Sequence, residues 1–461
     1  MRIGYAARDI TPQPGLTLSG FAARCDQPST GIDDPLAVHA LAAESGGQRV
    51  LLLVFDLLGL GPELTARLHA ALDRQPGLDL PVGQRVLCCT HTHSAPATVK
   101  LLGCGIPEPA YWDLVCQAAA AAAAAAMAAL AEVTVRTPTV AVSGANYNRR
   151  RFLADGRVAM TVGPDTKIVK SGPAWDTLRL FRFDAADGRP LAGLVHWAAH
   201  PDTVCSLHVT ADFPGELNRR LAQQWGCPFL FLQGPCGNLN PPFVKMNREE
   251  MLANVAGLMA RLQDMRWPAA TLPTAPFALR RQTVPLRYAP AMPADELRQF
   301  RAGMAEIADG GTGPAATRAL IANILNVEPG AAPDPCMLRH FAGIMRDWSA
   351  GVLARPRADL PAVCDCAVAV WRLGPVAWCA IAAEVFVETA LALQDAFPQL
   401  TVPVLSYAAP VVGYLPPDES MREGGYEVDY AWRFYGHHAP FAPGSEPAVR
   451  AALSALIHGT E

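Results

Sequence analysis

Two histidines one residue apart are the first feature of this sequence that could do chemistry. Thr90-His91-Thr92-His93-Ser94-Ala95-Pro96 directly follows an apolar run, Arg85 to Cys89. Side chains at positions i and i+2 of an extended chain point the same way, so both imidazoles can reach one pocket. Imidazole nitrogens are common zinc ligands. The segment therefore predicts a metal site, and the alternative is a polar loop with two hydrogen-bonded histidines.

A third histidine ends a second apolar run, Leu191 to Trp197, where that strand should leave its sheet. We expect His200 to join the first two histidines. His196, four residues earlier, is interpreted as a buried core or supporting group. Asp212 opens a predicted helix, where it would serve as an N-cap or as a carboxylate beside the site.

A turn-rich loop, Gly234 to Pro242, follows a third apolar strand, Pro228 to Gln233. Its glycines could expose backbone N–H groups to a ligand, which suits an oxyanion hole. The loop also carries Cys236, so a cysteine hydrolase with Cys236 as nucleophile is an alternative function.

Buried strands and helices alternate along the chain, which predicts an α/β fold of mixed, mainly parallel sheet layers flanked by helices. The segment 292–350 reads as broken helices, and we expect it to be an insertion or lid within a single catalytic domain covering 1–461. The expected strands and helices lie at 48–56, 63–72, 85–90, 111–132, 177–183, 191–197, 228–233, 366–373 and 376–381.

Composition excludes several classes of protein. The net charge is −4 and charged residues make up 17% of the chain, which gives no sign of nucleic-acid binding. No segment predicts a transmembrane helix, because the longest apolar stretch is dominated by alanine. The N-terminus shows no secretory signal, so we expect a cytoplasmic protein with reduced cysteines.

The order of these motifs resembles that of the neutral/alkaline ceramidases, zinc-dependent amidases that cleave N-acyl sphingosine. The resemblance spans nearly the whole chain: THTHSAP is similar to that family's THTHSGP, and FLQGPCGNLNPP to its glycine loop. ANYNRR, WAAHPDTV, AAEVFVE and VVGYLPPDESMREGGYEV match further segments in the same order.

The resemblance implies a Zn²⁺ ion held by four residues and a catalytic group of three more. The implied metal ligands are His91, His200, Glu384 and Tyr414. His93 would be an acid/base or carbonyl-polarising group, and Arg149 and Tyr426 would contact the substrate around the scissile bond.

The sequence departs from the family at Asn240, which stands where the ceramidases have a serine. Asparagine cannot be a nucleophile, but its amide could donate to a developing oxyanion while a metal activates water. The chain is also expected to lack the family's C-terminal immunoglobulin-like domain, so the resemblance does not fix ceramide as the substrate.

The predicted function is a zinc-dependent hydrolase that cleaves an amide or ester of an N-acyl-type, small-molecule substrate. A closed (β/α)₈ amidohydrolase barrel also uses an HxH motif, but the strand and helix spacing here is irregular. A zinc-binding protein without turnover is the alternative from another class.

Overall fold

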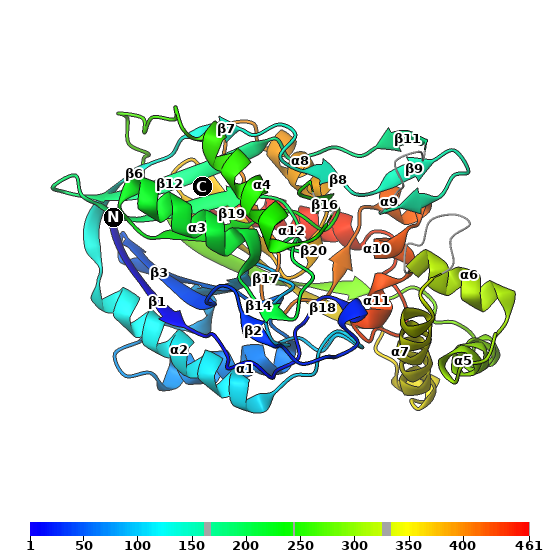
Figure 1. Cartoon of the computed structure of the whole chain (residues 1–461). Coiled ribbons are helices and arrows are strands. Elements are labelled where there is room, and N and C mark those ends of the chain that lie inside the picture. The colour runs from blue at the N-terminus through cyan, green and yellow to red at the C-terminus, as the bar shows by residue number, and fades with distance from the viewer. Residues whose placement is uncertain (161–166, 243–244, 325–332, 461) are drawn as a thin grey trace.

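The computed structural model describes residues 1–160, 167–242, 245–324 and 333–460. Two sheets form its centre (Figure 1). Along the larger sheet the strands follow the order β15 (Phe229–Gln233), β13 (Pro190–Trp197), β12 (Thr177–Ala185), β6 (Ala131–Arg136), β1 (Arg2–Asp9), β3 (Ala37–Ser45), β4 (Gln48–Phe55) and β5 (Arg85–Cys89), with β7 (Thr139–Ala141) pairing β12. The smaller sheet has the order β17 (Phe277–Arg287), β18 (Val363–Leu373), β19 (Val376–Ile381) and β21 (Val404–Leu405).

The predicted α/β class with a mixed sheet and flanking helices is confirmed, but the sheet is not mainly parallel. In the larger sheet only β4 with β5 and β13 with β15 are parallel pairs. The other pairs, including β1 with β3 and β3 with β4, are antiparallel. The layered arrangement also rules out the (β/α)₈ alternative.

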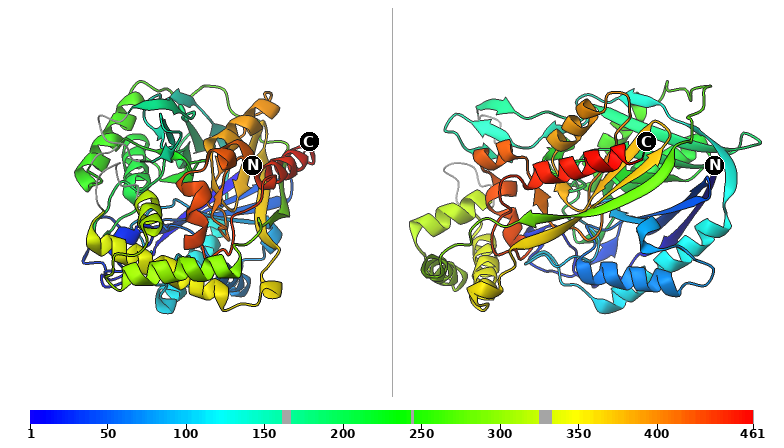
Figure 2. Two further views of the ribbon diagram at one scale, coloured as in Figure 1. Left: turned by 90° about the vertical axis from the view of Figure 1, so that its right-hand side faces the viewer. Right: turned by 180° about the vertical axis from the view of Figure 1, so that it is seen from behind.

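The two sheets pack face to face with helices outside them. Trp378 of β19 lies against Phe181 of β12, with ring centroids 4.7 Å apart. Helix α2 (Pro109–Ala128) covers β1 and β3, and α3 (Asp212–Trp225) covers β15. On the far side α12 (Ser445–His458) lies over β17 and β18, as Figure 2 shows from behind.

The remaining helices extend or flank these layers. They are α1 (Pro62–Arg74), α4 (Arg248–Arg261), α8 (Val387–Ala396), α9 (Asp418–Glu423), α10 (Tyr426–Asp429) and α11 (Ala431–Phe434), with short 3-10 turns η1 (Ala22–Arg24), η2 (Val82–Gln84) and η3 (Arg357–Asp359). No helix in the described ranges is long and apolar enough to cross a membrane.

Short strands complete the fold around the ends of the larger sheet. They are β9 (Arg151–Leu153) with β10 (Val158–Ala159) and β11 (Ile168–Ser171), β2 (Gly31–Ile32) with β14 (His208–Val209), β8 (Tyr147–Asn148) with β16 (Leu239–Asn240), and β20 (Glu384–Val385) with β22 (Tyr414–Leu415).

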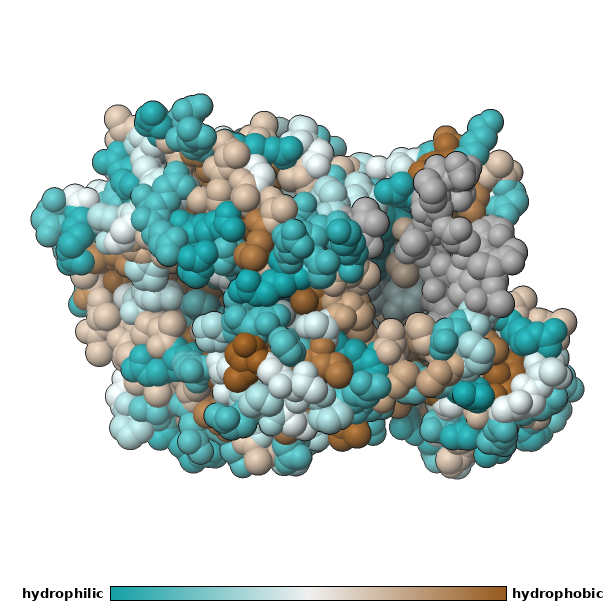
Figure 3. Space-filling view, viewed as in Figure 1, coloured by the Kyte–Doolittle hydropathy of each residue, from teal (hydrophilic) through white to brown (hydrophobic). Residues whose placement is uncertain are grey.

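The segment expected to be an insertion forms a separate helical block at one end of the molecule. The block contains α5 (Ala294–Ala308), α6 (Ala315–Ile324) and α7 (Pro335–Leu353), and residues 325–332 lie outside the described part. The space-filling view is hollowed where this block meets the main body (Figure 3). Its predicted role as a lid remains a prediction.

The larger sheet curls so that β15 lies against β4, which brings the ends of both parallel pairs together. Residues 406 and 407, which follow β21, form hydrogen bonds with the ends of β15 and β5. The Ser406 N–H donates to the Gln233 carbonyl at the end of β15, and the Cys89 N–H at the end of β5 donates to the Tyr407 carbonyl. The residues that follow β5, β13 and β15 therefore meet in one place.

Candidate metal centre and active site

Three imidazoles converge at this meeting point. Nε2 of His91 lies 3.1 Å from Nε2 of His200, and Nε2 of His93 lies 3.2 Å from the first and 3.0 Å from the second. Among the described residues, this is the group of histidine, cysteine and acidic side chains whose geometry suits a metal ion. The structure thus brings together the three histidines that the sequence singled out.

Backbone carbonyls fix the orientation of two of these rings. Nδ1 of His91 contacts the Leu58 carbonyl at 2.6 Å, and Nδ1 of His200 contacts the Cys236 carbonyl at 3.1 Å. A carbonyl only accepts, so each Nδ1 carries the proton and each Nε2 presents its lone pair to the centre. His91 also has a positive φ of 69°, an uncommon conformation of the kind found at functional sites.

The N-terminal segment 20–24, which includes the turn η1, packs against His93. Gly20 has a φ of +98°, and a Cβ added there would lie 2.5 Å from Cγ and Nδ1 of His93. The Arg24 guanidinium donates to the His93 carbonyl, and the Phe21 ring packs against the imidazole with centroids 5.0 Å apart. Glycine at position 20 is therefore what lets His93 reach the other two rings.

All three imidazoles are neutral because they are buried. Burial lowers the pKa of His91 to about 3, and it lowers the pKa values of His93 and His200 well below the ordinary range for histidine. The Arg149 cation lowers all three pKa values further. A neutral imidazole is the form that ligates a metal, so this environment keeps the three nitrogens available at neutral pH.

Glu384 adds a carboxylate to the cluster. Its Oε2 lies 3.5 Å from Nε2 of His91. Tyr435 donates to Oε1 at 2.5 Å and Tyr407 donates to Oε2 at 3.3 Å. Burial raises the pKa of Glu384 to about 7 despite these hydrogen bonds and the nearby Arg149 cation. A divalent cation beside it would favour its ionised form.

Tyr414 and Arg149 lie just outside the three histidines and Glu384. Glu384 and Tyr414 are partners in the two-strand pair of β20 and β22. Nη2 of Arg149 donates to the Tyr414 hydroxyl at 2.9 Å, while its Nε donates to Glu427 at 2.9 Å and its Nη1 to Oδ1 of Asn240 at 3.4 Å. The Arg149 side chain thus links the glycine loop to the tyrosine segment.

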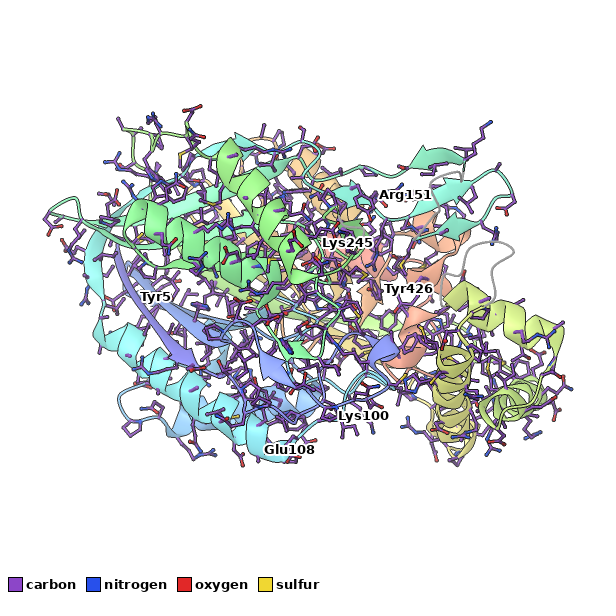
Figure 4. The ribbon with its side chains drawn as sticks, in the orientation of Figure 1. Tyr5, Lys100, Glu108, Arg151, Lys245 and Tyr426 are labelled. Atoms are coloured by element: carbon purple, nitrogen blue, oxygen red, sulfur yellow. The ribbon has the colours of Figure 1, made fainter. Side chains whose placement is uncertain are left out.

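Tyr426 lies near this network at the start of α10. Its ring centroid is 6.0 Å from that of Tyr414, and burial raises the pKa of its hydroxyl far above neutrality, so it is a hydrogen-bond donor. Figure 4 labels Tyr426 at the end of the main body that faces the helical block. All seven residues implied by the resemblance, together with Asn240, therefore lie in one connected region.

The two glycines of this loop do not present the free N–H groups that we expected of an oxyanion hole. The N–H groups of Gly234, Gly237 and Leu239 donate to the carbonyls of Trp197, Val385 and Cys236. These bonds hold the loop against β13 and β20. Asn240 directs its side-chain N–H toward Asp202 at 3.4 Å, so its amide is also partly engaged.

Cys236 is poorly suited to be a nucleophile. Its Sγ is 3.0 Å from the Tyr407 hydroxyl and 3.9 Å from Nδ1 of His200. Burial raises the pKa of its thiol far above the ordinary value, whereas catalytic cysteines have a lowered pKa. Its carbonyl, which orients His200, is the part that contributes to the site.

His196 is the buried group that was predicted, but Asp212 is not the N-cap of α3, because Ala211 has that position. Asp212 is the first residue of α3, and its carboxylate accepts from the N–H and hydroxyl of Thr203, which fixes the segment after His200. His196 is fully buried and contacts the Val404 carbonyl at 2.9 Å, away from the nitrogen cluster.

Three contributors were missed in the sequence: Tyr407, Tyr435 and Glu427. The Tyr407 ring stacks on His91 with centroids 3.7 Å apart. Glu427 is fully buried and accepts from both Arg149 and Arg150. The position of Tyr407 just after the short strand β21 was a usable signal, because the other site residues also follow strands.

Two solved structures that share this fold are ceramidases. The chain matches the neutral ceramidase from Pseudomonas aeruginosa with a TM-score of 0.68 at 16% identity, over 98% of this chain and 73% of the ceramidase. It matches a ceramidase complexed with C2 with a TM-score of 0.67 at 16% identity, over 98% and 74% of the two chains.

The protein therefore has the fold of the neutral ceramidases, which confirms the resemblance seen in the sequence at the level of structure. No protein-family model matches the sequence, and a search of curated proteins found no match.

Proposed function

We propose that this protein is a zinc-dependent hydrolase that cleaves an amide, or an ester, of an N-acyl-type substrate. The observation that carries the proposal is the convergence of three neutral imidazole nitrogens beside a carboxylate. The fold shared with ceramidases supports amide cleavage as the reaction class.

The donor set fits zinc. With zinc–nitrogen bonds of about 2.0–2.1 Å, tetrahedral ligand nitrogens lie roughly 3.3–3.4 Å apart. The Nε2 atoms here are 3.0–3.2 Å apart, so they need to separate by only a few tenths of an ångström. We propose His91, His93 and His200 as ligands, with Oε2 of Glu384 as a further donor, so His93 would bind the metal instead of serving as the acid/base.

A zinc ion held by these residues would supply Lewis-acid chemistry for hydrolysis near neutral pH. Arg149, Tyr414 and Tyr426 would orient the substrate and donate hydrogen bonds to it. Glu384 would stay ionised beside the cation, and the hydroxyls of Tyr407 and Tyr435 hold its carboxylate in place.

Oxyanion stabilisation would come from side chains, since the N–H groups of Gly234, Gly237 and Leu239 are occupied. The Tyr414 oxygen already receives a hydrogen bond from Arg149, which polarises its O–H toward a developing negative charge. Tyr426 supplies a second phenol in the same region. Direct ligation by Tyr414 is the alternative role for that residue, and the metal content of Tyr414→Phe separates the two roles.

The decisive experiment is elemental analysis of bound zinc in His91→Ala and His200→Ala, together with amine release from a panel of N-acyl compounds. We expect both variants to lose the metal, and hydrolysis to stop with a chelator and return with zinc. Full zinc occupancy in both variants would contradict the metal site. Zinc binding without turnover of any amide or ester would favour the non-catalytic alternative.

A further inference from the structure

A cavity lies beside Tyr435, between the helical block and the main body. Its volume is about 380 Å³, near the lower end of the range for small-molecule pockets. None of the three histidines, nor Arg149, Tyr414 or Tyr426, lines it. The lining includes Lys100, Leu102, Trp348, Val352, Arg355 and Tyr435.

The rim of this cavity is positively charged. Within the described ranges, neither Lys100 nor Arg355 has an acidic partner, and both side chains are exposed. Asp347, the acid in the lining, is paired with Arg346 at 2.8 Å. His438 also lines the cavity, but burial and the Arg355 charge lower its pKa, so it is neutral near pH 7. Two unpaired cations therefore face one opening, and Figure 4 labels Lys100 on the side facing α7.

One part of the cavity wall is aliphatic. Leu102, Val352 and Leu360 line it, and all three side chains are half-buried. Trp348 closes the wall, but it is only 3% exposed and its indole N–H donates to the His437 carbonyl. Aliphatic surface beside two cations matches a ligand with one anionic end and one apolar end.

We propose that this cavity binds a small amphipathic carboxylate, with its charged end between Lys100 and Arg355 and its hydrocarbon on Leu102, Val352 and Leu360. The inference is independent of the proposed hydrolysis. The ligand would contact the ring of Tyr435, whose hydroxyl holds Glu384. The same ring also packs against Gly413, whose carbonyl accepts the Glu384 N–H.

The test is isothermal titration calorimetry of the whole protein with octanoate below its micelle-forming concentration, with octylammonium as the probe of opposite charge. We expect octanoate to bind one site and octylammonium to bind at least tenfold more weakly. Each of Lys100→Ala and Arg355→Ala should weaken octanoate roughly two- to fivefold, as expected for exposed ion pairs, and the double variant roughly tenfold.

Two controls keep the result specific. Arg357→Ala removes a neighbouring exposed cation whose side chain donates to the Ala291 carbonyl outside the cavity, and it should leave octanoate affinity unchanged. His91→Ala distinguishes binding at the metal centre, because a carboxylate bound there would be lost in that variant. Equal binding of both probes, or octanoate binding that depends on His91 and not on the two cations, would overturn the proposal.

Discussion

Replacement of Gly20 by alanine tests whether the backbone of the N-terminal turn positions His93. The new Cβ would lie 2.5 Å from Cγ and Nδ1 of the imidazole, whereas ordinary contacts begin near 3.4 Å. The ring must therefore withdraw by about 0.9 Å, or the turn must open. Because φ is +98°, the alanine also adds backbone strain.

The two costs can be separated with Gly15→Ala as a matched control. Gly15 has a φ of +116°, but nothing lies within 4 Å of its added Cβ. Both variants should lose about 1–2 kcal/mol of unfolding free energy from backbone strain. Only Gly20→Ala should lose a further ~1–3 kcal/mol from the clash.

The functional consequence is a weakened metal site. A ligand displaced by about 1 Å can reduce site function by up to ~100-fold. Zinc titration against a competing chelator should show weaker binding in Gly20→Ala and unchanged binding in Gly15→Ala, with urea unfolding giving the two stabilities. Equal zinc affinity in the two variants would refute the argument that position 20 controls His93.

Three further outcomes follow from buried ionisable groups. Burial lowers the pKa of His196 to about 3, so the unfolded chain binds more protons and stability is lost as pH falls below the unfolded pKa of ~6.5. His196→Phe should remove about 2 kcal/mol of the stability lost between pH 7 and pH 5, measured by urea unfolding at both pH values. Glu384 has the opposite linkage: its raised pKa makes the ionised form unfavourable in the metal-free fold, and the cost appears as pH rises through 4.5 toward 7. Metal-free Glu384→Gln should therefore be about 3 kcal/mol more stable than wild type at pH 8 and nearly equal to it at pH 4, and a difference that does not change with pH would contradict this. Cys236→Ser should keep amide-hydrolysing activity in an amine-release assay, whereas loss of activity with the metal retained would restore the cysteine mechanism.

The buried strands were predictable because their residues are apolar on both faces. The expected strands at 48–56, 85–90 and 191–197 correspond to β4, β5 and β13 within one residue at each end. β1 and β3 gave no such signal. RIGYAARD carries two arginines and an acid, and AVHALAAES is rich in alanine, a weak strand former. Both strands pair antiparallel, and missing them made the sheet look mainly parallel.

The helix expected at 111–132 also extended too far, because Ala131 and Glu132 belong to β6. Alanine continues to favour helix at that point, while pairing of β6 with β1 and β12 imposes a strand.

The histidines of the site were predictable because HxH and HP segments sit at strand ends. The tyrosines that hold Glu384 were not, since a single tyrosine in an irregular segment has no periodic pattern. Tyr407 and Tyr435 reach the carboxylate only through packing between distant parts of the chain. The engagement of the glycine-loop N–H groups likewise depends on β13 and β20, which the loop sequence alone does not reveal.

The order in which the site residues occur along the chain determines when the centre is completed during synthesis. The three imidazoles belong to the first 200 residues, whereas Glu384, Tyr407 and Tyr435 belong to the last fifth of the chain. Domains emerge from the ribosome N-terminus first. A nascent chain that has passed β15 therefore carries every nitrogen donor but not the carboxylate or the phenols that hold it. Residues 406 and 407, which join the ends of β5 and β15, are also missing at that stage, so the centre is completed only by the C-terminal part of the chain.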